Sequence, residues 1–153
     1  MNEFDLIRRL TRALPTNPGV VVGAGDDCAV LEPGGPDRLL LFKTDAVVEG
    51  VHFLADAPPE KIGHKALARC LSDIAAMGGM PRAAVVSLGA PGGLGVEFCR
   101  ELYRGMDEIA RRFDCGIAGG DPVGSAAGLE LFPYRAEFCD PLTARVMSAI
   151  LRG

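Results

Sequence analysis

The sequence lacks the features that mark several broad classes of protein. Its net charge is −4, its isoelectric point is near 5.2, and lysine and arginine are clustered nowhere along it. Because affinity for a phosphate backbone depends on clustered basic side chains, no nucleic acid partner is expected. No uncharged run approaches the roughly 18 apolar residues of a membrane-spanning helix. Residues 1–14 carry acidic groups within a helical rhythm, unlike a signal peptide, so no membrane association is expected.

Paired cysteines are also lacking. The cysteines are odd in number, isolated and never in a CxxC pair, at Cys28, Cys70, Cys99, Cys115 and Cys139. Such spacing favours small thiols that fill a core in a reducing compartment over disulfides or zinc ligands. We therefore expect a cytoplasmic protein.

The common nucleotide-binding motifs are missing as well. No GxxxxGK[ST] stretch occurs, and GAGDDC at residues 23–28 does not match GxGxxG. Any ATP site in this chain must therefore be of another type. What the sequence does contain is 153 residues, of which 48% are apolar, and this is enough for one domain with a hydrophobic core.

Predicted strands alternate with predicted helices along most of the chain. Apolar periodicity and Gly/Pro stops predict helices over residues 4–14, 58–77 and 96–113, and strands over residues 20–22, 28–31, 38–48, 83–88 and 115–118. This alternation favours an α/β or α+β fold. After about residue 128 the pattern weakens, and the rest could hold one strand and one short helix with weak links to the earlier part.

Several carboxylates occur where the sequence predicts burial or a tight turn. They are Asp26 and Asp27 before a strand, Asp45 inside a strand, Asp73 in an apolar helix, and Asp121 after a strand. An isolated buried carboxylate costs several kcal/mol, and shared cations would remove that cost. Carboxylates without His or Cys clusters suit Mg²⁺, which binds one or two of them together with phosphate groups. Phosphoryl transfer is the reaction class that this combination favours.

Each of these positions also has a simple structural explanation. Residues 25–27 could form an Asx-type turn, Thr44-Asp45 a strand end exposed to water, Ser72-Asp73 a solvent-facing helix position, and residues 119–122 a plain turn. His52 is more often a satisfied strand histidine than a ligand contact. For each residue taken alone, the structural explanation is favoured over metal binding.

Taken together, four motifs resemble those of thiamine-monophosphate kinases in order and spacing. They are GDDCAVL at 25–31, TDAVVEGVHF at 44–53, KAL at 65–67 followed by LSDIAAMGG at 71–79, and GGD at 119–121. The resemblance covers residues 1–125 and extends to the aminoimidazole-ribonucleotide synthetase superfamily. It implies an α+β N-terminal domain that has a mixed sheet packed with helices and forms a homodimer through that sheet. It also implies ATP-dependent phosphorylation of thiamine monophosphate to thiamine diphosphate.

The resemblance also implies roles for particular residues. The implied Mg²⁺ ligands are Asp27, Thr44, Asp45, Asp73 and Asp121; Gly120 and Asp121 are implied nucleotide contacts, Tyr103 is a weaker ATP contact, and His52 contacts the substrate. No protein nucleophile is expected, since the substrate phosphate attacks in line. Two positions depart from the family pattern. Lys43 replaces a small hydroxyl residue before Thr-Asp, and Pro122 replaces a threonine after Gly-Gly-Asp.

The resemblance finally implies a chain about twice this long, with two domains. Residues 1–128 are expected to form the metal- and ATP-binding domain, residues 129–153 a divergent tail, and the C-terminal domain to be missing. We therefore expect little turnover of thiamine monophosphate by these residues alone. The alternatives are another ATP-dependent enzyme of the superfamily and a catalytically silent dimerisation or binding fragment.

Overall fold

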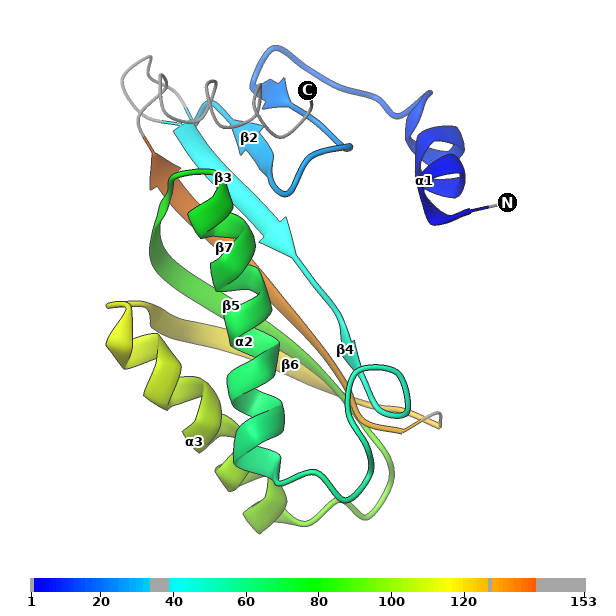
Figure 1. Cartoon of the computed structure of the whole chain (residues 1–153), viewed down its shortest axis with the longest axis vertical. Coiled ribbons are helices and arrows are strands. Elements are labelled where there is room, and N and C mark those ends of the chain that lie inside the picture. The colour runs from blue at the N-terminus through cyan, green and yellow to red at the C-terminus, as the bar shows by residue number, and fades with distance from the viewer. Residues whose placement is uncertain (1, 34–38, 127, 140–153) are drawn as a thin grey trace.

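The computed structural model describes residues 2–33, 39–126 and 128–139. The helices are α1 (Glu3–Thr11), α2 (Pro59–Ala76) and α3 (Val96–Arg112). Two of these three, α2 and α3, cover one face of a mixed sheet, while α1 stands apart (Figure 1). The strands are β1 (Val20–Val22), β2 (Ala29–Leu31), β3 (Leu39–Thr44), β4 (Val47–Val48), β5 (Met80–Ala90), β6 (Gly116–Gly124) and β7 (Glu130–Cys139). The predicted α+β class is confirmed, and the predicted helices correspond to α1, α2 and α3.

The sheet order is β1-β2-β3-β7-β5-β6, with β4 also paired to β7. Strands β5 and β6 run parallel, joined by α3 as the crossover, and the other pairs are antiparallel. Strand β7 therefore lies between β3 and β5, although it follows both of them in the sequence (Figure 1). The strand predicted after residue 128 is confirmed. The prediction that this part has only weak links to the preceding residues is wrong, because β7 pairs with both β3 and β5.

Pro133 explains why β7 does not look like an internal strand in the sequence. Proline has no N–H group to donate and is normally confined to edge strands. Here it lies opposite the break between β3 and β4, where its carbonyl accepts the Asp45 N–H at 3.3 Å and the Cys70 thiol at 3.5 Å. The missing donor thus falls where the neighbouring strand is interrupted. Residues 140–153, the rest of the predicted tail, lie outside the described residues.

Two other predictions about the strands are wrong. Asp45 does not lie inside a strand, because β3 ends at Thr44 and β4 begins at Val47. The residues 119–121 do not form a turn after a strand, because β6 continues through them to Gly124. The prediction ended this strand at Ala118, since glycine and proline are usually turn residues.

Two clusters of buried apolar side chains hold the helices on the sheet. The larger cluster joins α2, α3 and the strands, and includes Ile62, Leu67, Leu102, Met106, Val86 and Leu131. The smaller cluster joins β2, β3 and the end of α2, and consists of Cys28, Val30, Leu39, Leu41, Ile74 and Met77. Burial of each large apolar side chain stabilises the fold by about 1.5–3 kcal/mol. Helix α2 contributes to both clusters, so its position is fixed at each end.

Two glycines allow α2 and α3 to cross closely. A Cβ atom added at Gly63 of α2 would lie 1.9 Å from the Leu102 carbonyl oxygen of α3. Reciprocally, a Cβ atom added at Gly105 of α3 would lie 1.9 Å from the Glu60 carbonyl oxygen of α2. Because both obstacles are backbone atoms, neither can rotate away. The two helices are therefore in backbone contact, which sets both their separation and their register.

The opposite face of the sheet keeps apolar side chains in contact with water. Along β3 and β5, buried Leu41 and Val86 alternate with Phe42, which is 42% exposed, and Val85, which is 43% exposed. Successive side chains of a strand point to opposite faces, so Phe42 and Val85 lie on the face away from α2 and α3. Among the described residues, no helix combines the length and the apolar content needed to cross a membrane.

Candidate functional site

Two of the predicted metal ligands line one cavity at the end of β3. Asp27, in the loop between β1 and β2, and Thr44, the last residue of β3, border a cavity of about 620 Å³, together with Lys43. The loop is shaped by the Asp26 carboxylate, which accepts the Asp27 N–H at 2.9 Å. This bond goes to the next residue and is not the bond to the second residue on that defines an Asx turn, and the role of Asp27 as a metal ligand stays a prediction.

Two further predicted ligands, Asp45 and Asp73, belong to a group of four charged side chains between β3 and α2. Lys43 Nζ lies 2.5 Å from the Asp73 carboxylate. Arg69 donates to both carboxylate oxygens of Asp45, at 2.8 Å from Nε to Oδ2 and 3.1 Å from Nη2 to Oδ1. We call Lys43, Asp45, Arg69 and Asp73 the four-charge cluster. Its members alternate in sign and together carry no net charge.

The spacing of the four residues explains how the cluster forms. Lys43 and Asp45 are two residues apart on an extended segment, so both face α2. Arg69 and Asp73 are four residues apart on α2, so both face β3. Both elements carry the cation before the carboxylate, and because they run in opposite directions each carboxylate meets a cation of the other element. Arg69 was not recognised from the sequence, although the opposite charges at positions 69 and 73 were a usable signal.

The cluster is only partly accessible to water, and this shifts its pKa values. The side-chain exposures of Lys43, Asp45 and Asp73 lie between 19% and 26%. Burial alone would raise the pKa of Asp45, but the hydrogen bonds from Arg69 and from the Ala46 N–H outweigh it, and the pKa is lowered. Burial alone would lower the pKa of Lys43, but the contact with Asp73 outweighs it, and the pKa is raised. Both groups are therefore held in their charged forms.

The fifth predicted ligand, Asp121, lies elsewhere. It is an exposed residue of β6, in register with Ser87 of β5. Between it and Asp45 lie β5 and β7, which at about 4.8 Å per strand separation places the two backbones about 14 Å apart. Within residues 2–33, 39–126 and 128–139, no three His, Cys, Asp or Glu side chains converge on a position that could hold a metal ion. The shared ligation of one ion group by Asp121 and Asp45 stays a prediction.

Two residues predicted to contact the nucleotide do come together. Tyr103 of α3 and Gly120 of β6 border a cavity of about 490 Å³, which Gly119 and Pro122 also line. A Cβ atom at Gly120 would lie 2.0 Å from the Val86 carbonyl oxygen, so the strand cannot carry a side chain there. Partial burial raises the pKa of the Tyr103 hydroxyl, and Cys99 adds to this effect, so the hydroxyl remains a hydrogen-bond donor at neutral pH. Pro122 is tolerated because β6 is an edge strand.

His52, the predicted substrate contact, holds a turn. Its Nδ1 accepts the Val48 N–H at 3.1 Å, and its own N–H donates to the Val48 carbonyl at 2.8 Å. Its carbonyl accepts a hydrogen bond from Lys65 Nζ. The imidazole therefore has a structural partner, as the simple explanation of this histidine requires. The Nδ1 bond leaves Nε2 as the nitrogen that could meet a substrate.

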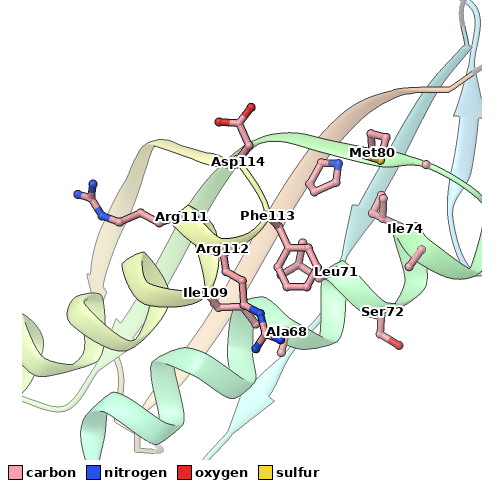
Figure 2. Close-up of a pocket in the computed structure, with 13 residues that line it drawn as sticks. Ala68, Leu71, Ser72, Ile74, Met80, Ile109, Arg111, Arg112, Phe113 and Asp114 are labelled. Carbon is pink, nitrogen blue, oxygen red and sulfur yellow. The ribbon is translucent and has the colours of Figure 1, made fainter.

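A third cavity, of about 660 Å³, is apolar and separate from the predicted site. It lies between the last turns of α2 and α3 and the start of β5 (Figure 2). In Figure 2 the Arg111 and Asp114 side chains point away from the apolar side chains that line it. Ser72 borders this cavity, whereas the next residue, Asp73, is turned toward Lys43. The larger cavity thus carries none of the predicted ligands.

The available donors fit some metal ions and not others. Carboxylate and hydroxyl oxygens suit a hard cation such as Mg²⁺. Since no three acidic, histidine or cysteine side chains converge among the described residues, a site closed by protein ligands alone does not fit. A cation that keeps water molecules and shares phosphate oxygens is compatible with these donors, with Asp27 and Thr44 at the cavity and Asp45 and Asp73 on the α2 side of β3.

Comparisons with known proteins agree with this fold. The family model described as AIR synthase related protein, N-terminal domain, matches residues 25–133. A thiamine-monophosphate kinase from Bacillus subtilis (strain 168) is 41% identical over 128 residues, which are 82% of this chain and 39% of that protein. The chain therefore spans about two fifths of the length of this relative.

Solved structures give the same result. The structure of AaThiL complexed with AMPPCP and TMP has a TM-score of 0.75 and 30% identity, covering 89% of this chain and 40% of that one. Thiamine monophosphate kinase from Aquifex aeolicus has a TM-score of 0.72 and 27% identity, covering 88% of this chain and 41% of that one. With a family model that spans more than half of its residues, the chain belongs to the AIR synthase related protein family, as its N-terminal domain.

Proposed function

We propose that this chain is the metal- and nucleotide-binding part of a thiamine-monophosphate kinase, which uses ATP and Mg²⁺ to convert thiamine monophosphate to thiamine diphosphate. The observation that carries the proposal is the similarity to thiamine-monophosphate kinases over 82% of the chain, which includes Asp45 after β3 and Asp73 in α2. A relative of the same fold is described in complex with AMPPCP and TMP. We therefore propose ATP and thiamine monophosphate as the substrates.

The residues of this chain would bind and orient rather than react. Asp27, Thr44, Asp45 and Asp73 would hold Mg²⁺, which neutralises phosphate charge when it is bound. Tyr103 and Gly120 would border the nucleotide, since they line one cavity. Asp121 and His52 would complete the site on the β6 and β4 sides. No side chain is required as a nucleophile, because positioning and charge neutralisation supply most of the catalysis of phosphoryl transfer.

Calorimetry with the nonhydrolysable nucleotide AMPPCP tests the binding half of this proposal. We expect Mg²⁺-dependent binding by the wild type and a loss of at least tenfold in Asp73→Asn, corresponding to about 1.4 kcal/mol. Glu101→Gln is a matched control, because Glu101 pairs with Arg104 on the surface of α3, away from the cluster. Absence of nucleotide binding at millimolar Mg²⁺ would contradict the proposal.

An assay for ADP separates the candidate functions. The chain alone is expected to produce little ADP with thiamine monophosphate, because surfaces found in the rest of the relatives have no counterpart in it. A fusion that continues after Pro133 with the remaining residues of the Bacillus subtilis relative should restore activity, and Asp45→Asn should remove it again. If the rate of ADP formation does not depend on thiamine monophosphate, the chain acts on another substrate. If the fusion forms no ADP, the chain is a binding fragment.

We also propose that the chain forms a homodimer through the open face of its sheet. Phe42 and Val85 are large apolar side chains that remain exposed on that face, and an exposed apolar face invites association. Sedimentation at micromolar concentration should show a species of twice the 16.1 kDa chain mass. Val85→Lys should convert this species to a monomer, whereas a wild-type monomer would contradict the proposal.

A further inference from the structure

The apolar cavity between the ends of α2 and α3 is lined in part by large side chains that remain in contact with water. Its volume is about 660 Å³, and Leu71, Ile74 and Ile109 line it as buried members of the two core clusters. Met80 at the start of β5 and Phe113 at the end of α3 line it too, yet they are 67% and 45% exposed. Removing apolar surface from water is favourable by about 25 cal/mol per Å². The cavity therefore has both room and a driving force for an apolar occupant.

The chain leaves the sheet beside this cavity. Phe138 of β7 lies in register with Met80, and Cys139, the last residue of β7, lies in register with Leu39 of β3. Paired residues of antiparallel strands have Cα atoms about 4.5–5.5 Å apart, so the backbone at Phe138 is one strand spacing from a residue that lines the cavity. Figure 1 shows this end of β7 beside the connection between α2 and β5. The residues that follow Cys139 in the sequence thus start next to the cavity.

The sequence after β7 has the pattern of an amphipathic helix. Its large apolar residues have the spacing of one helical face and are Leu142, Val146, Met147, Ile150 and Leu151. The polar residues of the opposite face are Arg145, Ser148 and Arg152. At 1.5 Å per residue, a helix over residues 142–151 would be about 15 Å long. The short helix predicted after residue 128 therefore has an apolar face that needs a partner.

We propose that residues 142–151 form this helix and that its apolar face fills the cavity of the same chain. Asp140 and Pro141 precede it, and such a pair is typical of a helix start, because aspartate accepts free N–H groups and proline fits the first turn. The connection from β7 is then very short, which keeps the helix beside the cavity. The inference goes beyond the proposed function and does not depend on it, since the cavity carries none of the predicted metal ligands. It also concerns residues beyond the match to the family model, which ends at residue 133.

Trypsin cleavage after Arg145 tests the proposal on the 153-residue chain, with mass spectrometry to identify the fragments. A protease cuts a docked segment mainly while it is detached, so the cleavage rate reports the detached fraction. Ile150→Asp places a charge on the apolar face and should raise the rate roughly tenfold. Ser148→Asp is the matched control, because it places the same charge on the polar face and should leave the rate unchanged.

The cavity itself is tested with Met80→Asp and Phe113→Asp. Both residues are partly exposed, so a charge at either position leaves the buried core intact while it opposes an apolar occupant. Each variant should raise the cleavage rate after Arg145 roughly tenfold. Val96→Asp is the matched control, because Val96 is 71% exposed at the other end of α3 and does not line the cavity. Circular dichroism checks folding, and either cavity variant suffices if the other does not fold.

Each outcome decides the proposal. Faster cleavage in Ile150→Asp and in a folded cavity variant, with both controls unchanged, supports docking in this cavity. If the wild type is cut as fast as Ile150→Asp, residues 142–151 do not dock and the proposal is wrong. If Ile150→Asp is cut faster but the cavity variants are not, the segment docks elsewhere and the assigned cavity is wrong. If the ratio of the Ile150→Asp rate to the wild-type rate grows with protein concentration, the occupant comes from a second copy, and docking within one chain is wrong.

Discussion

The ion pairs between β3 and α2 and those along α3 both join basic side chains to carboxylates, but they differ in how far water reaches them. On α3, Arg100, Arg104 and Arg111 pair with acids three or four residues earlier in the same helix, and these arginines are mostly exposed. In the four-charge cluster, the partners are 24 or more residues apart and lie between two packed elements. Water already solvates the α3 charges, so their pairing adds little. The charges of the cluster depend on their partners, because water reaches them only in part.

Two sides of helix α2 differ in how they contact the rest of the molecule. One side meets α3 through backbone contact at Gly63, and another presents Arg69 and Asp73 to β3. The close packing of α2 against α3 fixes the rotation of α2, and this determines where its charged side lies. The following changes test whether the two sides are coupled in this way and whether the cluster differs in energy from the pairs on α3.

The largest effect is expected from Gly63→Ala. The added Cβ atom would overlap the Leu102 carbonyl oxygen of α3, so the helices must separate, and overpacking of this kind costs about 3 kcal/mol. Urea denaturation should show the loss, and the Asp45 and Asp73 ion pairs should be weakened along with it. Gly92→Ala is the control, since a Cβ atom there meets nothing within 4 Å, and its midpoint should remain near that of the wild type. Equal midpoints for the two variants would exclude the proposed backbone contact.

Arg69→Met should have the next largest effect. It leaves the Asp45 carboxylate, which is 19% exposed, without its bidentate partner. The cost lies between that of breaking an exposed and a buried pair, about 1–2 kcal/mol in the free energy of unfolding. Urea unfolding at neutral pH measures it. A midpoint equal to that of the wild type would mean that the cluster behaves like the pairs on α3.

Lowering the pH should remove the difference between wild type and Arg69→Met. The pKa of Asp45 is lowered from its ordinary value of 3.8 in the folded chain, so its pairing stabilises the fold above that value. This stabilisation is lost as the pH falls through the lowered pKa, where folded Asp45 becomes protonated. The gap between the two urea midpoints should therefore be constant from about pH 7 to pH 5 and shrink below about pH 4. A gap that grows in acid would contradict the assigned direction of the pKa shift.

The smallest effect is expected from Arg104→Met. Arg104 pairs with Glu101 at 2.6 Å on the surface of α3, where both groups keep much of their water. The pKa of Arg104 is raised by that contact, yet an exposed charge loses little when its partner is removed. We expect no measurable change in the urea midpoint. A loss comparable to that of Arg69→Met would erase the distinction between the two sets of ion pairs.

Local patterns predicted most of the elements and singled out several candidate site residues. Apolar periodicity located α2 and α3, and the carboxylates of Asp27 and Asp73 could be singled out because they stand among glycines or apolar residues. The cluster partner Arg69 could not be identified in the same way. Its role depends on which side of α2 faces β3, and that orientation is set by the packing of Gly63 against α3.

The strands that defied local rules are β6 and β7. The residues of β6 include glycines and a proline, which normally end strands, and only pairing with β5 keeps them extended. Pro133 has no N–H group to donate, which disfavours an internal strand, but it lies opposite the break between β3 and β4. Tertiary pairing overrode local preference in both places. Asp121 was therefore placed after a strand when it lies within one.

The position of β7 has a consequence for the order in which the molecule assembles. Strands β1, β2 and β3 form one set and β5 and β6 another, and within the described residues the two sets are joined in the sheet only through β7. A chain emerging from the ribosome can form each set early, but it cannot join them until residues 130–139 have been made. Pairings between distant segments are slow to form. A nascent chain paused before residue 130 should thus present unpaired strand edges on β3 and β5, the state in which chaperones would be needed most.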